Sequence, residues 1–408
     1  MLIKITPLKM KKGFVLLISM LYFTIIVKAQ IDFIDRYEEL NTITTAVPFL
    51  IISPDAKAGG MGDVGVASTP DAMSMHWNPA KYAFVDDQAG VAVCYTPWLK
   101  SLIPDIDLSY LSGYTKRNDN EAFAFALRYF TLGEIKFTDN SGNSLGSFNP
   151  NELALSTAYS RKLSDNMSTA IALRYIYSNL TGGQQVGTLP TEAGQSIAGD
   201  VSAFYLKPIR LGSQNADLSI GLNISNIGSK IAYTETTTRD FIPTNMRFGS
   251  AVTTAIDDYN KISIEIDFNK LLVPTPPQYD SDGEIIAGMN PDVSVVSGIF
   301  QSFGDAPGGA KEEFREIIYS FGTEYWYDEQ FAVRAGYFHE APTKGDRQFF
   351  SLGAGLRYNV FGLDFSYLIP VRSRDEAGAV NPLSNTLRFA LTFDFGALQE
   401  KPIIPNES

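Results

Sequence analysis

From about residue 88 to residue 396, short segments alternate large apolar residues with small or polar ones, and each segment ends in a turn. The last segment has apolar residues on one face, namely Leu387, Phe389, Leu391, Phe393 and Phe395, and its other face carries Arg388, Ala390, Thr392 and Asp394. A period of two is the period of a β-strand. Each predicted strand therefore has one face that suits hydrocarbon and one that carries charge.

Residues 1–29 have the pattern of a secretory signal peptide. Lys9, Lys11 and Lys12 precede an apolar run over residues 14–27, and Val27-Lys28-Ala29 forms a small-residue cleavage pattern before Gln30. The alternative is a membrane anchor, but the run is shorter than the roughly 20 residues that a spanning helix needs. Met10 is a second candidate start, because the apolar run follows it closely.

The rest of the chain has no second long apolar run, although 45% of the full sequence is hydrophobic and 12% is aromatic. A membrane protein without apolar helices has to be a closed barrel, because only closure pairs every strand edge in lipid. The net charge of −12 argues against nucleic acid or anionic lipid as a partner. Cys94 is the single cysteine, so no disulfide framework is expected.

The sequence predicts an all-β fold, a 14-stranded antiparallel transmembrane barrel over residues 88–396. The predicted strands centre near Val93, Tyr110, Phe125, Leu155, Leu173, Ala203, Ile220, Phe248, Ile264, Phe321, Val333, Leu352, Phe365 and Phe389. Short polar links alternate with long ones, which lie at 97–106, 131–151, 179–198, 228–242, 271–313, 340–346 and 371–384. Even strand number and sorted links are typical of outer-membrane barrels. We therefore expect the outer membrane of a diderm bacterium, with long loops outside and both termini in the periplasm.

Charged residues recur on the face opposite the apolar one. The arginines are Arg128, Arg174, Arg247, Arg334, Arg357 and Arg388, and the acids are Glu265, Asp267, Glu324, Asp364 and Asp394. A charge facing hydrocarbon at the membrane midplane costs about 2–4 kcal/mol, so this face is predicted to line the lumen. The lumen is then either a charged conduit or a lattice of ion pairs that fills a closed barrel. The mixed signs favour the lattice.

Residues 30–87 precede the barrel, and their second half does not alternate. They contain three motifs, Ser53-Pro54-Asp55-Ala56, then Ala58-Gly59-Gly60-Met61-Gly62-Asp63-Val64-Gly65, and Trp77-Asn78-Pro79-Ala80-Lys81. A glycine-rich loop before a helix also suggests phosphate binding, but the lysine-serine pair of a P-loop is missing. Asp71 is expected to cap a short helical turn that ends before Pro79.

The glycine-rich stretch, Asp71-Ala72 and Asn78-Pro79-Ala80 resemble the N-terminal signature of FadL-like outer-membrane barrels. The full set of motifs is similar to the PorV (LptO) family of the type IX secretion system. The sequence departs from that family at His76, where an aromatic residue is usual. The resemblance implies fourteen strands and a plug inside the lumen that includes Gly59, Gly60, Met61, Gly62, Asp63, Asn78, Pro79 and Ala80. Residues 397–408 would be a periplasmic tail.

The resemblance also implies a role in protein export. Proteins of this family associate with an SprA-type translocon, collect cargo that bears a C-terminal signal domain, and pass it to a PorU-type sortase complex. Membrane lipid and lipopolysaccharide are the other implied partners, and no nucleic acid is expected. The alternative family name reflects a link to lipopolysaccharide deacylation, which implies participation and not a catalytic site.

No enzyme, cofactor or metal site is predicted. The chain has two histidines, His76 in the plug segment and His339 near a strand end. No nucleophile-elbow motif accompanies them, and their spacing does not match a metal site.

Two long links contain apolar clusters that suggest partner binding. Val296, Ile299, Phe300 and Phe303 have the i, i+3, i+4, i+7 spacing of one helix face. Trp98, Leu102 and Ile103 form the second cluster. Exposed apolar clusters mark contact surfaces, but both links would also serve as lids over the barrel mouth. Two other functions stay open, a FadL-like transporter of hydrophobic small molecules and a purely structural outer-membrane protein.

Overall fold

The computed structural model describes residues 40–101, 103, 105–138, 141, 144–183, 190–212, 214–234, 239–373 and 380–396. The predicted signal peptide and C-terminal tail lie outside these ranges. None of the helices in the described ranges is long and apolar enough to cross a membrane.

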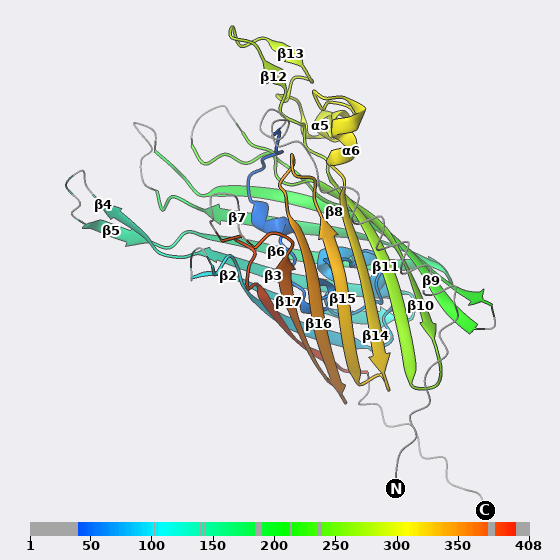
Figure 1. The fold of residues 1–408 in the computed structure, drawn as a ribbon. Coiled ribbons are helices and arrows are strands. Elements are labelled where there is room, and N and C mark those ends of the chain that lie inside the picture. The colour runs from blue at the N-terminus through cyan, green and yellow to red at the C-terminus, as the bar shows by residue number, and fades with distance from the viewer. Residues whose placement is uncertain are drawn as a thin grey trace, which may run out of the picture. The chain divides into compact units, whose positions relative to one another are not determined.

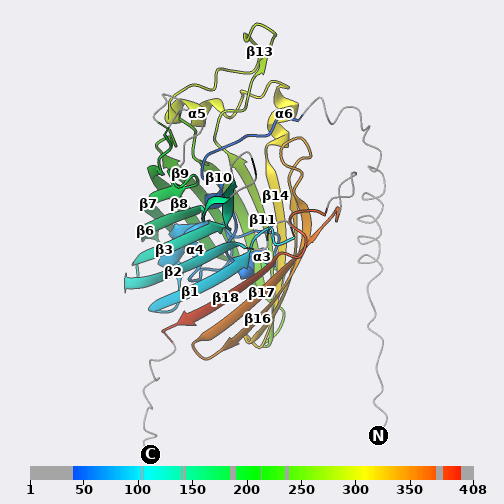
Figure 2. The same ribbon diagram turned by 90° about the vertical axis from the view of Figure 1, so that its left-hand side faces the viewer.

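Fourteen antiparallel strands form one closed barrel, which confirms the predicted fold class (Figures 1 and 2). The strands are β1 Ala89–Pro97, β2 Ile106–Asn118, β3 Glu121–Leu132, β6 Asn151–Ser164, β7 Met167–Asn179, β8 Gly194–Leu211, β9 Gln214–Gly228, β10 Asn245–Ala255, β11 Asn260–Leu271, β14 Ile318–Tyr327, β15 Phe331–His339, β16 Gln348–Tyr358, β17 Phe361–Pro370 and β18 Leu387–Asp394. Each residue predicted as a strand centre lies in its own strand. β1 and β18 close the barrel in a register that pairs Gly90 with Asp394 and Tyr95 with Phe389.

The connections sort to two ends of the barrel. Tight turns join β2 to β3, β6 to β7, β8 to β9, β10 to β11, β14 to β15 and β16 to β17 at the short-turn end. The other connections lie at the long-loop end. They include the hairpin of β4 Ile135–Thr138 with β5 Ser144–Phe148 and the hairpin of β12 Gln278–Tyr279 with β13 Ile285–Ala287. Figures 1 and 2 show the second hairpin grouped with α5 Val295–Gln301 and α6 Ala310–Arg315.

Between residue 40 and β1, the structure has four short helical pieces, η1 Pro48–Ile51, α3 Ala56–Gly59, α4 Ser74–Trp77 and η2 Pro79–Phe84. The Asp71 carboxylate accepts a hydrogen bond from the Met73 amide at the start of the turn that leads into α4. α4 ends at Trp77, immediately before Asn78 and Pro79, as expected from a proline that cannot continue a helix.

The alternation in the sequence has the predicted phase. On β7 and β8, Ile171, Leu173, Ile197 and Val201 are exposed on the outside, whereas Ala172 and Ala198 are buried on the inside. Side chains of this kind on every barrel strand except β2 form an apolar exterior. Since exposed apolar surface on this scale is stable in lipid and unstable in water, the exterior is a membrane-facing belt.

The belt generates a prediction about position along one strand. Leu173, which is 64% exposed, lies at the middle of β7, and Met167 faces the same side at the short-turn end of that strand. Leu173→Arg should lower the free energy of unfolding by about 2–4 kcal/mol, whereas Met167→Arg should cost about 0–1 kcal/mol because the charge lies near the interface. Denaturant titration of the protein in lipid vesicles measures both. Equal costs at the two positions would contradict the belt.

Candidate functional site

Residues 41–88 run through the barrel from one end to the other; we call them the lumenal segment. At the long-loop end, the Asn41 amide donates to the carbonyl of Thr343 (3.1 Å), and its side chain donates to Pro276 and Glu312 (3.0 Å each). At the short-turn end, Gln88 exchanges hydrogen bonds with Lys116 directly before β1. The described part of the segment begins at the long-loop end, and β18 finishes at the short-turn end. The predicted periplasmic location of the two termini concerns residues outside the described ranges.

The Asn-Pro-Ala motif fastens the lumenal segment to the barrel wall. The Asn78 side chain accepts from the Ala80 amide and donates to the carbonyls of Val66 and Ala203, all at 3.0 Å. The Ala80 carbonyl accepts from the hydroxyls of Ser160 (3.1 Å) and Ser168 (2.6 Å). Pro79 and Ala80 are buried beside these strands. The side-chain amide of Asn78 therefore forms hydrogen bonds with backbone groups at a turn of the segment, where no helix or strand pairs them.

The glycine-rich motif lies against the opposite part of the wall. Gly59, Gly60, Met61 and Gly62 are all buried, and the Gly62 amide donates to the Ser351 hydroxyl on β16 (2.7 Å). A Cβ added to Gly336 on β15 would lie 2.0 Å from the Met61 carbonyl carbon. This wall glycine is required because two backbones approach each other without room for a side chain.

Ion pairs join the wall strands to one another and to the lumenal segment. Arg334 binds Glu324 (2.6 Å) and Asp364 (2.8 Å), and Asp364 also accepts from Arg357 (2.7 Å). Two further pairs are Arg174 with Asp200 (2.9 Å) and Arg388 with Asp63 of the segment (2.6 Å). Removing one partner of a buried pair costs about 3–5 kcal/mol, so these pairs fix the arrangement strongly.

The predicted pairing of arginine with acid is wrong at five positions, one of which is Asp394, which forms no ion pair with the described residues. Arg128 donates to the carbonyls of Phe49, Leu50 and Ile52 and to Nδ1 of His76, and Arg247 stacks on the ring of Trp77. Asp267 accepts from the Gly65 and Val66 amides (2.8 and 3.0 Å). Within the described ranges Glu265 has no hydrogen-bond or ion-pair partner. The backbone of the lumenal segment supplies the donors and acceptors that were expected from other side chains.

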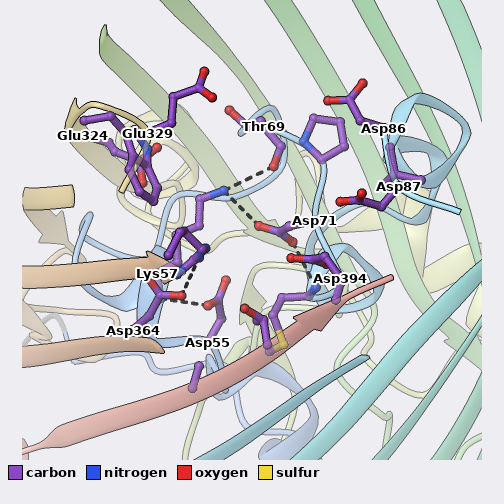
Figure 3. Close-up of a pocket in the computed structure, with 18 of the residues that line it drawn as sticks. Asp55, Lys57, Thr69, Asp71, Asp86, Asp87, Glu324, Glu329, Asp364 and Asp394 are labelled. Carbon is purple, nitrogen blue, oxygen red and sulfur yellow. Dashed lines mark hydrogen bonds and ion pairs between the residues drawn. The ribbon is translucent and has the colours of Figure 1, made fainter. Parts of the chain in front are cut away.

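A cavity of about 250 Å³ lies at the short-turn end (Figure 3). Its carboxylates outnumber its cations, the lining acids being Asp55, Asp71, Asp86, Asp87, Glu324, Glu329, Asp364 and Asp394, and the cations Lys57, Lys261 and Arg357. In Figure 3 the Lys57 ammonium points to Asp71 and Thr69, at 2.9 and 3.4 Å. This acidic vestibule will concentrate cations at the mouth of the barrel.

The connection from β11 to β14 carries an apolar surface at the long-loop end, which we call the outer platform. Its exposed side chains are Val296 and Phe300 on α5, Phe303 after α5, and Phe314 on α6. Phe300 is 74% exposed and Phe303 is 51% exposed, while Ile299 is half-buried. Beside them, Phe303, Phe314 and Ile317 line an apolar pocket of about 360 Å³. The predicted helical stripe is only partly helical, since α5 ends at Gln301.

Two buried lysines fix the base of the outer platform. Lys270 of β11 binds Glu313 (3.1 Å) and Glu316 (2.5 Å), and Lys344 binds Glu312 (2.5 Å) and Glu316 (3.0 Å). Glu312 also accepts from Asn41, the first residue of the lumenal segment. α6 is therefore held to the barrel rim, the neighbouring loop and the lumenal segment together.

The first loop, at 97–106, does not form a comparable surface. Trp98 was predicted as an exposed anchor, but it is half-buried and packs on apolar residues of the lumen that include Phe49, Leu368 and Leu383. Ile103 is 45% exposed, and Leu102 lies outside the described residues. Trp98 thus covers the lumen as a lid, because the apolar residues beneath it are otherwise open to solvent.

The described residues contain no group of three or more His, Cys, Asp or Glu side chains placed to hold a metal ion. Nδ1 of His76 accepts a hydrogen bond from the Arg128 guanidinium (2.8 Å), which can only donate. His76 is therefore a neutral structural acceptor.

Sequence reasoning missed the lysines that hold the outer platform and the wall glycines that admit the lumenal segment. Lys270 and Lys344 are far apart in the chain from α6, so no local pattern connects them. Gly221, Gly249, Gly322 and Gly336 all lie where a Cβ would touch the lumenal segment. The sequence offers one indication of their role, which is that they stand at strand positions whose side chains would point into the lumen.

Comparisons with known proteins found a family match and distant structural neighbours. A family model described as type IX secretion system protein PorV matches residues 35–278. A comparison with curated protein sequences found no match. The toluene transporter TbuX of Ralstonia pickettii is 10% identical, covers 85% of this chain and 100% of its own, and has a TM-score of 0.46. A Pseudomonas aeruginosa FadL homologue is 13% identical, covers 87% of this chain and 99% of its own, and has a TM-score of 0.41.

The close approach of the Gly336 and Met61 backbones predicts that position 336 has to be a glycine for the lumenal segment to keep its place. Gly336→Ala should displace the segment and expose Lys57 and Lys81 to trypsin, because its Cβ would overlap the Met61 backbone. Gly199→Ala is the matched control, since its Cβ would meet only the Ala172 carbonyl at 3.5 Å. Mass spectrometry of the tryptic fragments measures cleavage after Lys57 and Lys81 in both variants. Equal protection of the two variants would contradict the contact.

A filled lumen also predicts the electrical behaviour of the protein. The purified barrel in planar bilayers should show no steady large current, because the lumenal segment and the ion pairs occupy the path between the two ends. A porin measured in the same bilayers establishes that an open pore is detectable. Sustained porin-like conductance would show that the lumenal segment does not close the barrel.

Proposed function

This chain belongs to the PorV family of type IX secretion system proteins, and we propose that it acts there by docking its outer platform on the translocon. In this proposal it collects cargo with a C-terminal signal domain and delivers that cargo to the sortase complex. The long-loop end faces the outside, and the short turns and the acidic vestibule face the periplasm. The observation that carries the proposal is the apolar outer platform on its ion-paired base.

The outer platform has the composition of a binding surface. Phe300 protrudes, and the pocket between Phe303 and Phe314 is large enough to receive a side chain of the partner. Aromatic residues in a desolvated contact are the usual centre of binding energy, and truncating one typically costs about 2 kcal/mol or more. A face this apolar, held above the membrane belt by a polar base, is costly to leave in water.

The outer platform is also preorganised. The lysine and glutamate side chains beneath α6 are buried, so the platform keeps one position without a partner. Binding then loses little conformational entropy, which favours affinity. Around the apolar centre, Asp280, Asp282, Glu284 and Asp292 are exposed. The translocon surface that fits is therefore an apolar groove with a basic rim.

The geometry gives less support to a transporter of hydrophobic small molecules. Such a transporter needs an apolar path through the lumen, and here the lumen contains the chain from Asn41 to Gln88 together with buried ion pairs. Recovery of secreted cargo with the purified protein separates the two functions, because a small-molecule transporter has no reason to retain cargo.

Truncation of the aromatic anchors tests the docking. Phe300→Ala combined with Phe303→Ala should reduce translocon co-purification at least tenfold, since about 2 kcal/mol per anchor is lost. Cargo secretion should fall with it. The amount of folded barrel in the membrane should stay at the wild-type level, because both residues lie outside the strands.

Tyr259→Ala provides the matched control. Tyr259 is 60% exposed in a turn at the opposite end of the barrel, so its loss should leave the complex intact. If the double variant secretes cargo and retains the translocon like the wild type, the outer platform is a lid and docking uses another surface.

A further inference from the structure

Arg247 is the one lumenal arginine of the predicted set that finds neither an anion nor a carbonyl. It projects inward from β10 and is 7% exposed. Its guanidinium lies 4.5 Å from the centre of the Trp77 ring. Within the described ranges no side chain or carbonyl accepts a hydrogen bond from it, although a guanidinium has five N–H donors.

The ring of Trp77 does not replace these acceptors. A cation over an aromatic face is attracted to the ring, but the N–H groups in the guanidinium plane still need oxygen acceptors around its edge. A buried charge without such partners is strongly unfavourable. Another group must therefore complete the environment of Arg247.

Arg247 faces a cavity of about 50 Å³ on the long-loop side of the lumen. Three other side chains of its lining, Ser53, Asn245 and Asn269, donate no hydrogen bond within the described ranges. Nε of Arg388 is also buried without an acceptor. Asp63 binds Arg388, and one oxygen of Asp267 accepts two amides. The second oxygen of Asp267 and the side-chain oxygens of Ser53 and Asn269 are buried without a partner, but the N–H donors of Arg247, Arg388, Asn245 and Asn269 outnumber these acceptors.

We propose that this cavity binds one small oxyanion, such as inorganic phosphate, sulfate or a short carboxylate, with Arg247 as the main ligand. The planar fork of a guanidinium matches two oxygens of such an anion. The cavity has room for about three to five water molecules, which is the size of an anion of four or five heavy atoms. It is too small for an alkyl chain, so a lipid or fatty acid does not fit.

The bound anion would fasten the lumenal segment to the wall. Ser53 and Trp77 belong to the segment, whereas Arg247, Asn245 and Asn269 belong to β10 and β11. An anion between them would join the two parts where no direct ion pair does so. The free oxygens of Asp267 and Asn269 would accept from water in the remaining space.

The test is calorimetric titration of the purified barrel in detergent with sodium sulfate, sodium phosphate and sodium acetate, at constant ionic strength balanced with chloride. The wild type should bind at least one of these anions with a stoichiometry of one. Arg247→Gln should weaken that binding at least tenfold. Arg247→Lys, which keeps the charge and loses the fork, should give an intermediate affinity.

A second variant separates loss of the site from loss of the fold. Ser53→Ala combined with Asn269→Ala keeps Arg247 and should weaken the same binding while the barrel retains its heat-resistant mobility in gels. If the wild type binds none of the three anions more tightly than chloride, the cavity holds water alone and the proposal fails. Unchanged binding by a folded Arg247→Gln variant overturns it as well.

Discussion

Backbone pairing in hydrocarbon is the constraint on which the rest of this structure depends. No water can satisfy a free strand edge there, so the sheet has to close, and the pairing of β1 with β18 completes it. Closure with fourteen strands leaves an interior wider than side chains alone can fill. The protein fills it with its own chain, and the resulting core is polar because both the wall and the lumenal segment contribute backbone groups. The charged inward face of the wall and the lumenal segment therefore fill the interior together.

The contacts inside the barrel show how the wall and the lumenal segment satisfy each other's polar groups. Where the lumenal segment carries free carbonyls, the wall supplies Arg128, and where it carries free amides, the wall supplies Asp267. Where the two backbones meet directly, the wall has a glycine such as Gly336. Buried ion pairs then occupy positions that the segment does not reach, as Arg334 does with Glu324 and Asp364. Arg128, Asp267 and Gly336 each contact a particular stretch of the segment, so sliding the segment by one residue would break several contacts at once.

The alternation in the sequence was enough to predict every barrel strand and the side of the wall on which each arginine lies, because strand period and lipid exclusion are local rules. It was not enough to predict what the inward residues bind. Arg128 and Asp267 pair with backbone atoms of a segment whose path has no periodic signature, and Trp98 turned inward because apolar residues from distant strands lie beneath it. The outer platform was predicted from its aromatic spacing, while Lys270 and Lys344, which hold it in place, are linked to α6 only through the closed barrel.

A barrel whose interior is bonded through its whole length has little freedom to act by opening. Its wall faces lipid, its lumen is filled with chain, and the remaining large apolar feature in the described residues is the outer platform, which the same buried lysines keep rigid. Asn41 connects this platform to the lumenal segment through Glu312. Force or strain applied to α6 by a partner would therefore be resisted by the whole interior and not by one loop. In the docking proposed above, a rigid and membrane-anchored outer platform leaves the motion to the partner and not to the barrel.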